Sequence, residues 1–539
     1  MLNVIVTVLT FLFFINVLYK TLFWLHLWQI KEYRIDRLMV HLRETIQGRS
    51  LIRGRVSVFR LLLIFFYFSL VYYNILTLYS ALILFFFIIV LFDKKSVFFE
   101  RRIRIPEFTT KIVFIFLTTC SFAFLMYIFS PIDIAFWVLT IDFLIPFFIA
   151  AQIILFSIPA DLTRDITINR AIKKRENLKN LMVIGITGSY GKGSTKEYMS
   201  AILSQKFKVV KTKDTYNTSI GIARSILKDV NTKTKIFIVE MGAYKKGEIQ
   251  FMCNMVHPLI GVLTAVNEQH VSLFGSIENT MKAKYELIDS IPNNGISLFN
   301  GNNQNALKLY RKTRKKRVLY ETSYNNRGSI ADIQARDIKV SVFSISFTVF
   351  LRGRNIGIFK TNLIGRHHIE NLLPGIWIAE KMGMTGSEIK KALLAIFPFN
   401  KTMEPYVSSS HTVLIDDTFN ANPASVHAGI EYLTVLKGKK ALVLQPMIEL
   451  GESAAYYHYE IGKHAGRVCT DLFLTNKNFL KDIQKGIKES KRSIRVEVLN
   501  PTEISYYISN FSQDDGVVFE GKEAAGALSL IEKRKVFGL

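Results

Sequence analysis

A short glycine-rich loop is the segment of this sequence whose residue types point most directly to chemistry. Residues 187–194 read Thr-Gly-Ser-Tyr-Gly-Lys-Gly-Ser. The apolar run before them, at 181–186, predicts a buried parallel strand, and a helical pattern begins at Thr195. In that context the backbone N–H groups of the loop and the helix start can hold phosphates, Lys192 can reach the outer ones, and a hydroxyl can bind Mg²⁺. The pattern predicts an ATP site that includes Thr187, Gly188, Ser189, Gly191, Lys192, Gly193 and Ser194.

The spacing of this loop differs from the standard phosphate-binding form, because Ile186 stands where the first glycine would be. Gly193 also has no side chain, so the hydroxyl that holds Mg²⁺ must come from Ser194. A glycine loop alone is a weak signal, whereas a glycine loop between a strand and a helix is a strong one.

Five later segments combine carboxylates, histidines, lysines and amides. They are Val239–Ala243, Asn267–Ser276, Lys282–Glu286, Gly365–Asn371 and Asp416–Pro423. Together with the glycine loop, and in this order, they resemble the motifs of the Mur ligase family over about residues 180–530. The last segment, with residues 449–452 and His458 after it, is most like the family branch that adds D-alanyl-D-alanine to UDP-MurNAc-tripeptide.

The resemblance implies a role for several individual residues. It makes Glu240, His270 and a carbamylated Lys284 ligands of Mg²⁺ beside Ser194, with Lys192, Lys284 and His270 as catalytic residues. It also implies that nucleotide contacts come from Asn371, Asp417 and Asn420.

Plainer interpretations remain open for these residues. Glu240 ends the apolar run 236–239, where it is either a catalytic group at the edge of a parallel sheet or a capped strand end. His270 is either a metal ligand or a hydrogen-bonded loop histidine. Lys284 is either the modified lysine or a solvated one, a description that suits Lys282 better.

The implied reaction is ATP-dependent joining of a carboxylate to an amine, with release of ADP. In this family the carboxylate attacks the γ-phosphate, and the amine then displaces phosphate from the acyl phosphate. Because two anions must meet, such a site needs cations, here Lys192 and Mg²⁺.

Five departures from the family pattern leave the substrate open. No soluble domain for a uridine nucleotide precedes the glycine loop, and 401–405 lacks the family's arginine. Residues 445–447 read Gln-Pro-Met where Gly-Asp-Met is expected, and 520–522 read Glu-Gly-Lys where Lys-Gly-Ser is expected. The Gly-Lys-Gly-Ser of the loop is more typical of the folylpolyglutamate branch.

Composition divides the 539 residues into an apolar part and an enzyme part. Half of the residues are hydrophobic, and the excess lies before about residue 160. The net charge is +26, and a basic excess lies in the short loops between apolar blocks, which favours the inner face of a membrane over nucleic acid. Three scattered cysteines indicate neither disulfides nor a metal site.

The apolar part predicts five membrane helices. One covers about the first 28 residues, two form a hairpin within 61–92 that turns near Asn74, and the last two are 112–129 and 135–158. A signal peptide is the alternative for the first, but no cleavage site follows it. Basic loops at 31–60 and 93–111 place the N-terminus outside and the enzyme in the cytoplasm. Asp142, inside the last helix, is either a contact within the bundle or a functional group.

The expected architecture is therefore a transmembrane region at 1–160, an α/β ATP-binding domain at 175–397 and a smaller Rossmann-like domain at 398–539. The leading hypothesis is a multi-pass enzyme of the cell membrane that adds an amino acid or dipeptide to a cell-wall precursor, UDP-linked or lipid-linked. An envelope-polymer ligase of the polyglutamate type and an inactive ATP-binding scaffold are the rivals. Retention of Lys192, Glu240, His270 and Lys284 argues against the scaffold.

Overall fold

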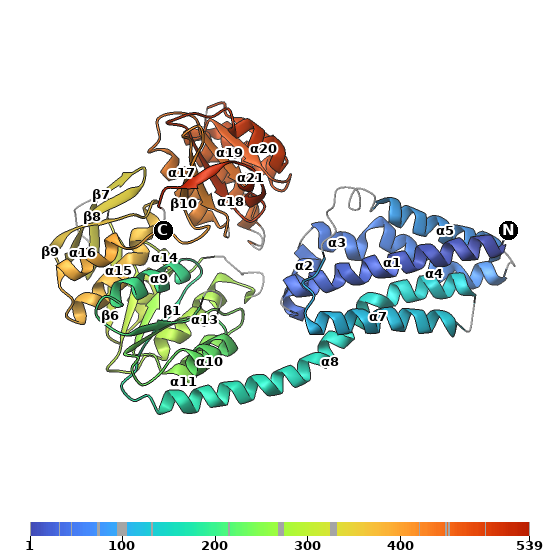
Figure 1. Ribbon diagram of the computed structural model, residues 1–539, viewed down its shortest axis with the longest axis horizontal. Coiled ribbons are helices and arrows are strands. Elements are labelled where there is room, and N and C mark those ends of the chain that lie inside the picture. The colour runs from blue at the N-terminus through green and yellow to red at the C-terminus, as the bar shows by residue number, and fades with distance from the viewer. Residues whose placement is uncertain are drawn as a thin grey trace. The chain divides into compact units, whose positions relative to one another are not determined.

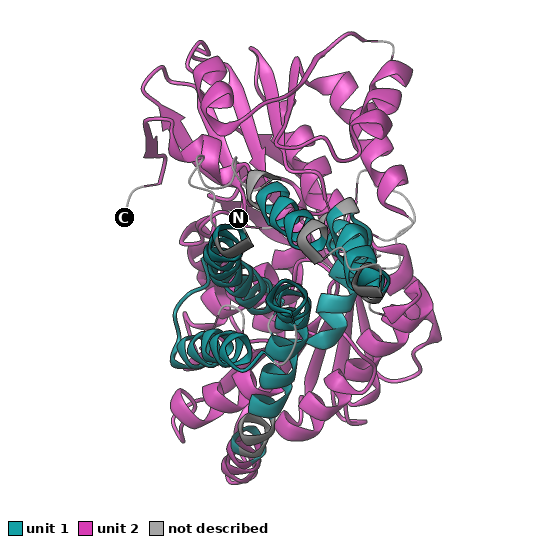
Figure 2. Cartoon of the chain, turned by 90° about the vertical axis from the view of Figure 1, so that its right-hand side faces the viewer, with its two compact units in different colours: residues 1–165 teal, residues 166–539 magenta. Residues whose placement is uncertain are grey.

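The computed structural model describes most of the chain. The described residues are 2–31, 33–44, 46–72, 76–93, 105–130, 133–213, 216–267, 274–323, 331–419, 421–447, 450, 453–490 and 492–537. His270, Asn420 and the expected turn at Asn74 lie outside them. The chain divides into two compact units, Met1–Asp165 and Ile166–Leu539, which Figure 2 shows in different colours.

The N-terminal unit is helical. Its helices are α1 (Leu2–Ile30), α2 (Ile35–Glu44), α3 (Ile46–Arg53), α4 (Arg55–Tyr72), α5 (Leu76–Asp93), α7 (Thr110–Ile128) and the first part of α8 (Ile134–Glu176) (Figure 1). The segment 31–60, expected as a loop, contains α2 and α3 and the start of α4. The basic segment after residue 164 is not an irregular linker either, because α8 continues through it to Glu176.

Three stretches among the described residues are long and apolar enough to cross a membrane: Val4–Ile30, Thr110–Ile128 and Ile134–Ser157. Helices α4 and α5 have 18 residues each. They pair as an antiparallel hairpin, because the rings of Tyr67 and Tyr79 lie 5.1 Å apart and those of Phe59 and Phe86 lie 6.1 Å apart. These findings agree with the expected helices, and a membrane position for them stays a prediction.

Asp142 faces the interior of this helical unit and is fully buried. Its carboxylate lies 3.0 Å from the Lys20 ammonium of α1 and 2.9 Å from Nε of Arg60 in α4, and it accepts a hydrogen bond from Asn16 at 2.6 Å. The residue is therefore a contact within the bundle. Because charges are expensive away from water unless they are paired, this cluster holds α1, α4 and α8 in one arrangement.

The second unit begins with a nine-stranded sheet in the order β2-β3-β1-β4-β5-β6-β7-β8-β9. Its strands are β1 (Met182–Thr187), β2 (Val209–Lys211), β3 (Ile236–Glu240), β4 (Ile260–Leu263), β5 (Ile296–Asn300), β6 (Arg317–Thr322), β7 (Ile333–Ser341), β8 (Ser344–Leu351) and β9 (Arg354–Thr361). Strands β2 to β7 are parallel, and β7, β8 and β9 pair in antiparallel fashion.

Helices cover both faces of this sheet, so its central strands are apolar throughout. Val183 of β1 packs with α10 (Ser219–Lys228), α11 (Glu248–Val256) and α13 (Ile277–Asp289). Its neighbour Ile184 packs on the other face with α9 (Lys192–Leu203), α15 (His367–Lys381) and α16 (Gly386–Leu394). Helix α14 (Gln304–Lys312) packs beside β5. The carboxyl ends of β1, β3 and β4 therefore open at one edge, where open α/β sheets bind ligands.

A second, seven-stranded sheet follows in the order β14-β13-β12-β15-β11-β10-β16. Its strands are β10 (Glu404–Ser408), β11 (Val413–Asp417), β12 (Lys440–Leu444), β13 (Asp471–Leu474), β14 (Arg495–Val498), β15 (Gly516–Glu520) and β16 (Lys533–Lys535). Among these described strands, β10 runs antiparallel to both of its neighbours, β11 and β16, and the other neighbouring pairs are parallel. Its helices are α17 (Pro423–Leu433), α18 (Ala454–Val468), α19 (Leu480–Glu489), α20 (Pro501–Ile508) and α21 (Ala525–Ser529).

Two acidic residues stand side by side at the carboxyl end of this sheet. Asp417 of β11 and Glu520 of β15 are register partners, and Glu520 has no exposed surface. Burial raises the pKa of both carboxyl groups, that of Asp417 to about 7 and that of Glu520 well above its ordinary value. Asp417 raises the pKa of Glu520 further, whereas hydrogen bonds from Met403 and Glu520 lower the pKa of Asp417. The pair therefore retains at least one proton near neutral pH.

The pair predicts a fold that weakens in mild alkali. The folded state keeps protons that the unfolded state has already lost, so stability falls as pH rises through about 7. In calorimetry of the full chain between pH 5.5 and 8.5, Glu520→Gln should lose less stability than the wild type, by on the order of 1–2 kcal/mol. Glu532→Gln, at an exposed carboxylate, should follow the wild type. Parallel profiles for wild type and Glu520→Gln would contradict the shared-proton pair.

Candidate active site

The glycine loop lies between β1 and α9 and is held so tightly that only glycine fits at two positions. Gly188 and Gly191 both have positive φ. A Cβ at Gly188 would lie 2.0 Å from the Thr264 hydroxyl, and one at Gly191 would lie 2.5 Å from Oδ1 of Asn371. The Thr264 hydroxyl also donates a hydrogen bond to the Tyr190 carbonyl at 2.5 Å. The loop is therefore pressed against the end of β4 on one side and the start of α15 on the other.

Lys192 is the first residue of α9, and its ammonium lies across its own loop. It donates to the carbonyls of Gly188 at 2.8 Å and Ser189 at 3.2 Å. Burial lowers the pKa of Lys192, and the negative charge of Glu240 partly opposes this effect. The predicted phosphate-binding cation is thus within the loop, at the N-terminus of a helix.

Glu240 ends β3 and points toward the first turn of α9. A Cβ at Gly193 would lie 3.7 Å from its Oε2, so the carboxylate adjoins the segment that carries Ser194. Its backbone N–H donates to the Thr212 hydroxyl, and Asn217 donates to its Oε1 at 3.3 Å. Glu240 is therefore more than a capped strand end, because its side chain faces the glycine loop.

Lys196 is a charged group of this site that sequence reasoning missed. It is one turn beyond Lys192 on α9, almost completely buried, with Nζ 3.2 Å from Oε2 of Glu240 and 3.6 Å from Oε1 of Glu197. A lysine four residues after Lys192, on a helix whose other faces pack in the core, was the signal available in the sequence. The ammonium of Lys196 is therefore a counterion of the Glu240 carboxylate.

The oxygen donors at this edge suit Mg²⁺ and a nucleotide phosphate. The Glu240 carboxylate and the Ser194 hydroxyl are hard oxygen ligands, and the loop gives backbone N–H donors beside Lys192. In the part of the chain that the structure describes, no group of three or more His, Cys, Asp or Glu side chains forms a complete metal site. This is consistent with a Mg²⁺ that keeps water and phosphate oxygens among its ligands.

Lys284 is buried on α13, with 4% of its surface exposed, whereas Lys282 is exposed. Burial and the nearby charge of Lys192 lower the pKa of Lys284 to about 7, against the influence of Glu248, Glu286 and Glu240. Two of these acids are already engaged, since Glu248 accepts from the N–H of Tyr244 and Glu286 from that of Gly247. A lysine in this environment is not a solvated one, and much of it is a neutral amine at pH 7–8.

The histidine loop begins at a residue that touches the glycine loop. Asn267 donates its backbone N–H to the Ser189 hydroxyl at 3.0 Å and accepts a hydrogen bond from Asn303 at 2.8 Å. His270 itself lies outside the described residues, three positions later. The predicted role of His270 stays a prediction.

The start of α15 packs against the glycine loop. Asn371 accepts a hydrogen bond from the Thr195 hydroxyl at 3.2 Å. Of the two histidines in the same first turn, His368 is buried and His367 is half-buried, and burial lowers the pKa of His367 to about 4 and that of His368 well below its ordinary value. His368 bonds to the Tyr198 hydroxyl at 2.8 Å, which agrees with a packing role for it.

Asp417, predicted to face the nucleotide, accepts a hydrogen bond from the backbone of Met403 at 3.2 Å. It is close enough to Tyr198 of α9 to help raise the pKa of that phenol, after the larger effect of burial. The structure therefore brings Asp417 toward α9 but shows no direct contact with the glycine loop among the described residues. Asn420 lies outside those residues.

Comparison with known proteins agrees with this geometry. Residues 186–379 match the family model described as the Mur ligase middle domain. The chain is 31% identical over 285 residues to the UDP-N-acetylmuramoyl-tripeptide–D-alanyl-D-alanine ligase of Bacillus subtilis, covering 52% of this chain and 59% of the relative. It is 29% identical over 293 residues to the Escherichia coli enzyme of the same name, covering 54% and 64%. The chain thus spans about three fifths of the length of these relatives.

Two solved structures share the fold. MurF from Acinetobacter baumannii aligns with a TM-score of 0.60 at 21% identity, over 68% of this chain and 79% of the other. MurF ligase from Thermotoga maritima in complex with ADP aligns with a TM-score of 0.59 at 22% identity, over 68% and 83%. Residues 186–379 thus match the Mur ligase middle domain in sequence, and the ligase unit shares the fold of these structures, in a chain that carries an additional helical N-terminal region.

Proposed function

We propose that this protein is a membrane-anchored, ATP-dependent ligase that joins the carboxylate of a cell-wall precursor to the amine of an amino acid or dipeptide. The observation that carries the proposal is the meeting of Lys192, Lys196, Glu240 and Lys284 beside the glycine loop. A domain that only bound nucleotide would need the loop and Lys192. It would not need a buried carboxylate and a buried lysine of lowered pKa next to them.

Each residue has a task that follows from its surroundings. The loop N–H groups and Lys192 would hold and orient the phosphates, and Glu240 with Ser194 would hold Mg²⁺. Bound there, ATP and Mg²⁺ supply an activated phosphoryl group and the positive charge that lets an anionic acceptor approach it. Lys196 would balance Glu240 and keep its carboxylate directed at the loop.

Lys284 suits carbamylation because its neutral amine can attack CO₂. The N–C bond forms as the amine loses a proton, and the product is a carboxylate on the end of the lysine. That carboxylate would become a second acidic ligand near Glu240. The change from a cation to an anion would also remove the repulsion between Lys284 and Lys192.

The proposed sequence of bond changes has two stages. The acceptor carboxylate takes the γ-phosphoryl group, ADP leaves, and an acyl phosphate results. The amine then attacks the acyl carbon, phosphate leaves with the bonding electrons, and the amine proton passes to solvent or to a base. The names of the curated relatives make D-alanyl-D-alanine the first amine to assay.

Membrane anchoring is supported by the apolar stretches Val4–Ile30, Thr110–Ile128 and Ile134–Ser157. The last of them belongs to α8, which continues without interruption to Glu176. Lys174 and Arg175 near its end donate to the Leu227 and Val256 carbonyls, in the last turns of α10 and α11. These bonds join the last turns of α8 to α10 and α11 within the ligase unit.

Lys192→Ala should abolish ATP hydrolysis that depends on both acceptor and amine. The loss should be about 100- to 1,000-fold in kcat, because the transferred phosphoryl group loses its fixed cation. Release of ADP and phosphate is measured with both substrates present and with each omitted. Formation of AMP and pyrophosphate by the wild type would overturn the proposed reaction.

Lys284→Ala should be nearly inactive, and a small carboxylic acid should partly restore its activity by replacing the carbamate. Lys282→Ala is the matched control, because this lysine is two residues away on the same helix and exposed. It should retain nearly full activity. Equal losses at both positions without rescue would return Lys284 to a structural role.

The N-terminus should lie outside the cell and the ligase inside. In a cysteine-free background, cysteines placed at Ser130 or Asn74 should react with an impermeant maleimide in intact cells. Cysteines at Ser50 or Ser96 should react only after permeabilisation. Labelling at Ser50 in intact cells would show the orientation to be inverted.

A further inference from the structure

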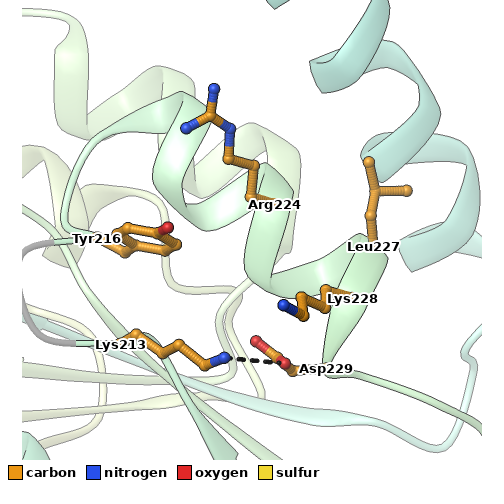
Figure 3. Close-up of a pocket in the computed structure, with 6 residues that line it drawn as sticks. All are labelled: Lys213, Tyr216, Arg224, Leu227, Lys228 and Asp229. Atoms are coloured by element: carbon orange, nitrogen blue, oxygen red, sulfur yellow. Dashed lines mark ion pairs between the residues drawn. The ribbon is translucent and has the colours of Figure 1, made fainter. Parts of the chain in front are cut away.

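A basic pocket lies beside α10, outside the residues assigned above. It is lined by Lys213, Tyr216, Arg224, Leu227, Lys228 and Asp229 and has a volume of about 380 Å³ (Figure 3). Figure 3 shows Lys213 and Tyr216 approaching from the segment before the helix, while Arg224 and Lys228 extend from the helix one turn apart. The pocket thus has an aromatic side and a cationic side.

The described residues that line this pocket carry three cations and one carboxylate. Lys213 lies 3.4 Å from that carboxylate, which belongs to Asp229. Arg224 and Lys228 form no ion pair with a described carboxylate. Two exposed cations at (i, i+4) on one helix repel each other, so the arrangement is slightly unfavourable without an anion. A phosphate or diphosphate group would relieve the repulsion and accept the hydrogen bonds of both side chains.

The pocket adjoins the candidate active site through a single peptide link. Tyr216 precedes Asn217, whose side chain donates to Glu240 and whose carbonyl accepts from Gly242. From there the cations extend along α10, a helix of ten residues and about 15 Å. This length suits an acceptor in which a sugar and part of a peptide separate the phosphate from the reacting carboxylate.

The pocket is also tied to α8. Lys174 of α8 donates to the carbonyl of Leu227, which lines the pocket, at 2.8 Å. Lys174 belongs to the same helix as Ser157, the end of the last apolar stretch, and follows it by 17 positions.

We propose that the pocket of Lys213, Tyr216, Arg224 and Lys228 binds the phosphate or diphosphate group of the acceptor. The inference rests on the proposed ligase function and adds the site that recognises the anionic end of the substrate. The pocket would give the ligase unit a surface for the phosphate or diphosphate group, in a chain whose N-terminal unit is helical and apolar. Arg224 and Lys228 determine affinity for the acceptor and take no part in bond making.

The test compares Arg224→Ala/Lys228→Ala with Lys390→Ala/Lys391→Ala in the full-length protein in lipid nanodiscs. The control pair removes the same charge from exposed positions on α16. Two acceptors are used, UDP-N-acetylmuramoyl-tripeptide and the same tripeptide sugar on a polyprenyl diphosphate. The pocket variant should raise the acceptor KM about 10- to 30-fold, with kcat and the KM for ATP little changed. The control should behave as the wild type.

Salt gives a second readout, because exposed charges are screened. The wild-type acceptor KM should rise with ionic strength, and that of the pocket variant should rise less. An effect on both acceptors identifies the shared diphosphate as the ligand, and an effect on the polyprenyl acceptor alone identifies the lipid headgroup. An unchanged KM for both acceptors, in a variant that still turns over, would overturn the pocket assignment and leave the ligase function standing.

Binding without turnover separates this inference from the proposed function. Affinity for each acceptor is measured by microscale thermophoresis in the absence of ATP. If the wild type binds an acceptor but joins nothing to it, the ligase proposal fails, while weaker binding by the pocket variant still supports the site. Equal binding by wild type and pocket variant rejects the site whatever the activity.

Discussion

The ligase unit depends on how closely its backbone approaches itself at the glycine loop. Gly188 contacts the end of β4 and Gly191 contacts Asn371 of α15 at distances that no Cβ would allow. Ser189 also bonds to Asn267, at the start of the histidine loop. One turn of chain thus joins a strand, two helices and a loop, so a side chain added there would disturb all of them at once.

The same close packing buries charged side chains near the glycine loop, which requires them to form ion pairs or shifts their pKa. Lys192, Lys196, Glu240 and Lys284 come from three separate elements and share one edge of a sheet. Paired charges such as Lys196 and Glu240 are stable there, at 3.2 Å. Lys284 forms no ion pair with a described carboxylate, and its burial lowers its pKa and so favours the neutral amine. The same burial therefore produces both a fixed ion pair and a reactive lysine.

The N-terminal unit also contains a buried carboxylate that is paired with cations. Asp142 is enclosed by Lys20, Arg60 and Asn16 in an otherwise apolar bundle. Such a cluster selects one packing of α1, α4 and α8, because other arrangements leave a charge without a partner. Helix α8 itself extends from this bundle to Glu176, which belongs to the second unit.

Much of this protein follows from local sequence alone. The apolar run 181–186 and the glycines after it predicted β1, the loop and α9, because strand, tight turn and helix each have local signatures. The uncharged stretches predicted the long helices, since length and apolar composition are also local properties. Lys284 was separated from Lys282 by resemblance to a family motif, and the structure supports that choice through burial alone.

Other features depended on residues that are distant in the sequence. Lys196 could not be paired with Glu240, nor Asp417 with Glu520, because these contacts exist only after β1, β3, β11 and β15 have taken their places. The ion pairs of Asp142 could not be predicted either, since Lys20 and Arg60 are more than 80 residues away. Residue type and spacing determined which groups could do chemistry. Tertiary packing decided which of them meet, because burial and charge pairing are properties of a folded neighbourhood rather than of a segment.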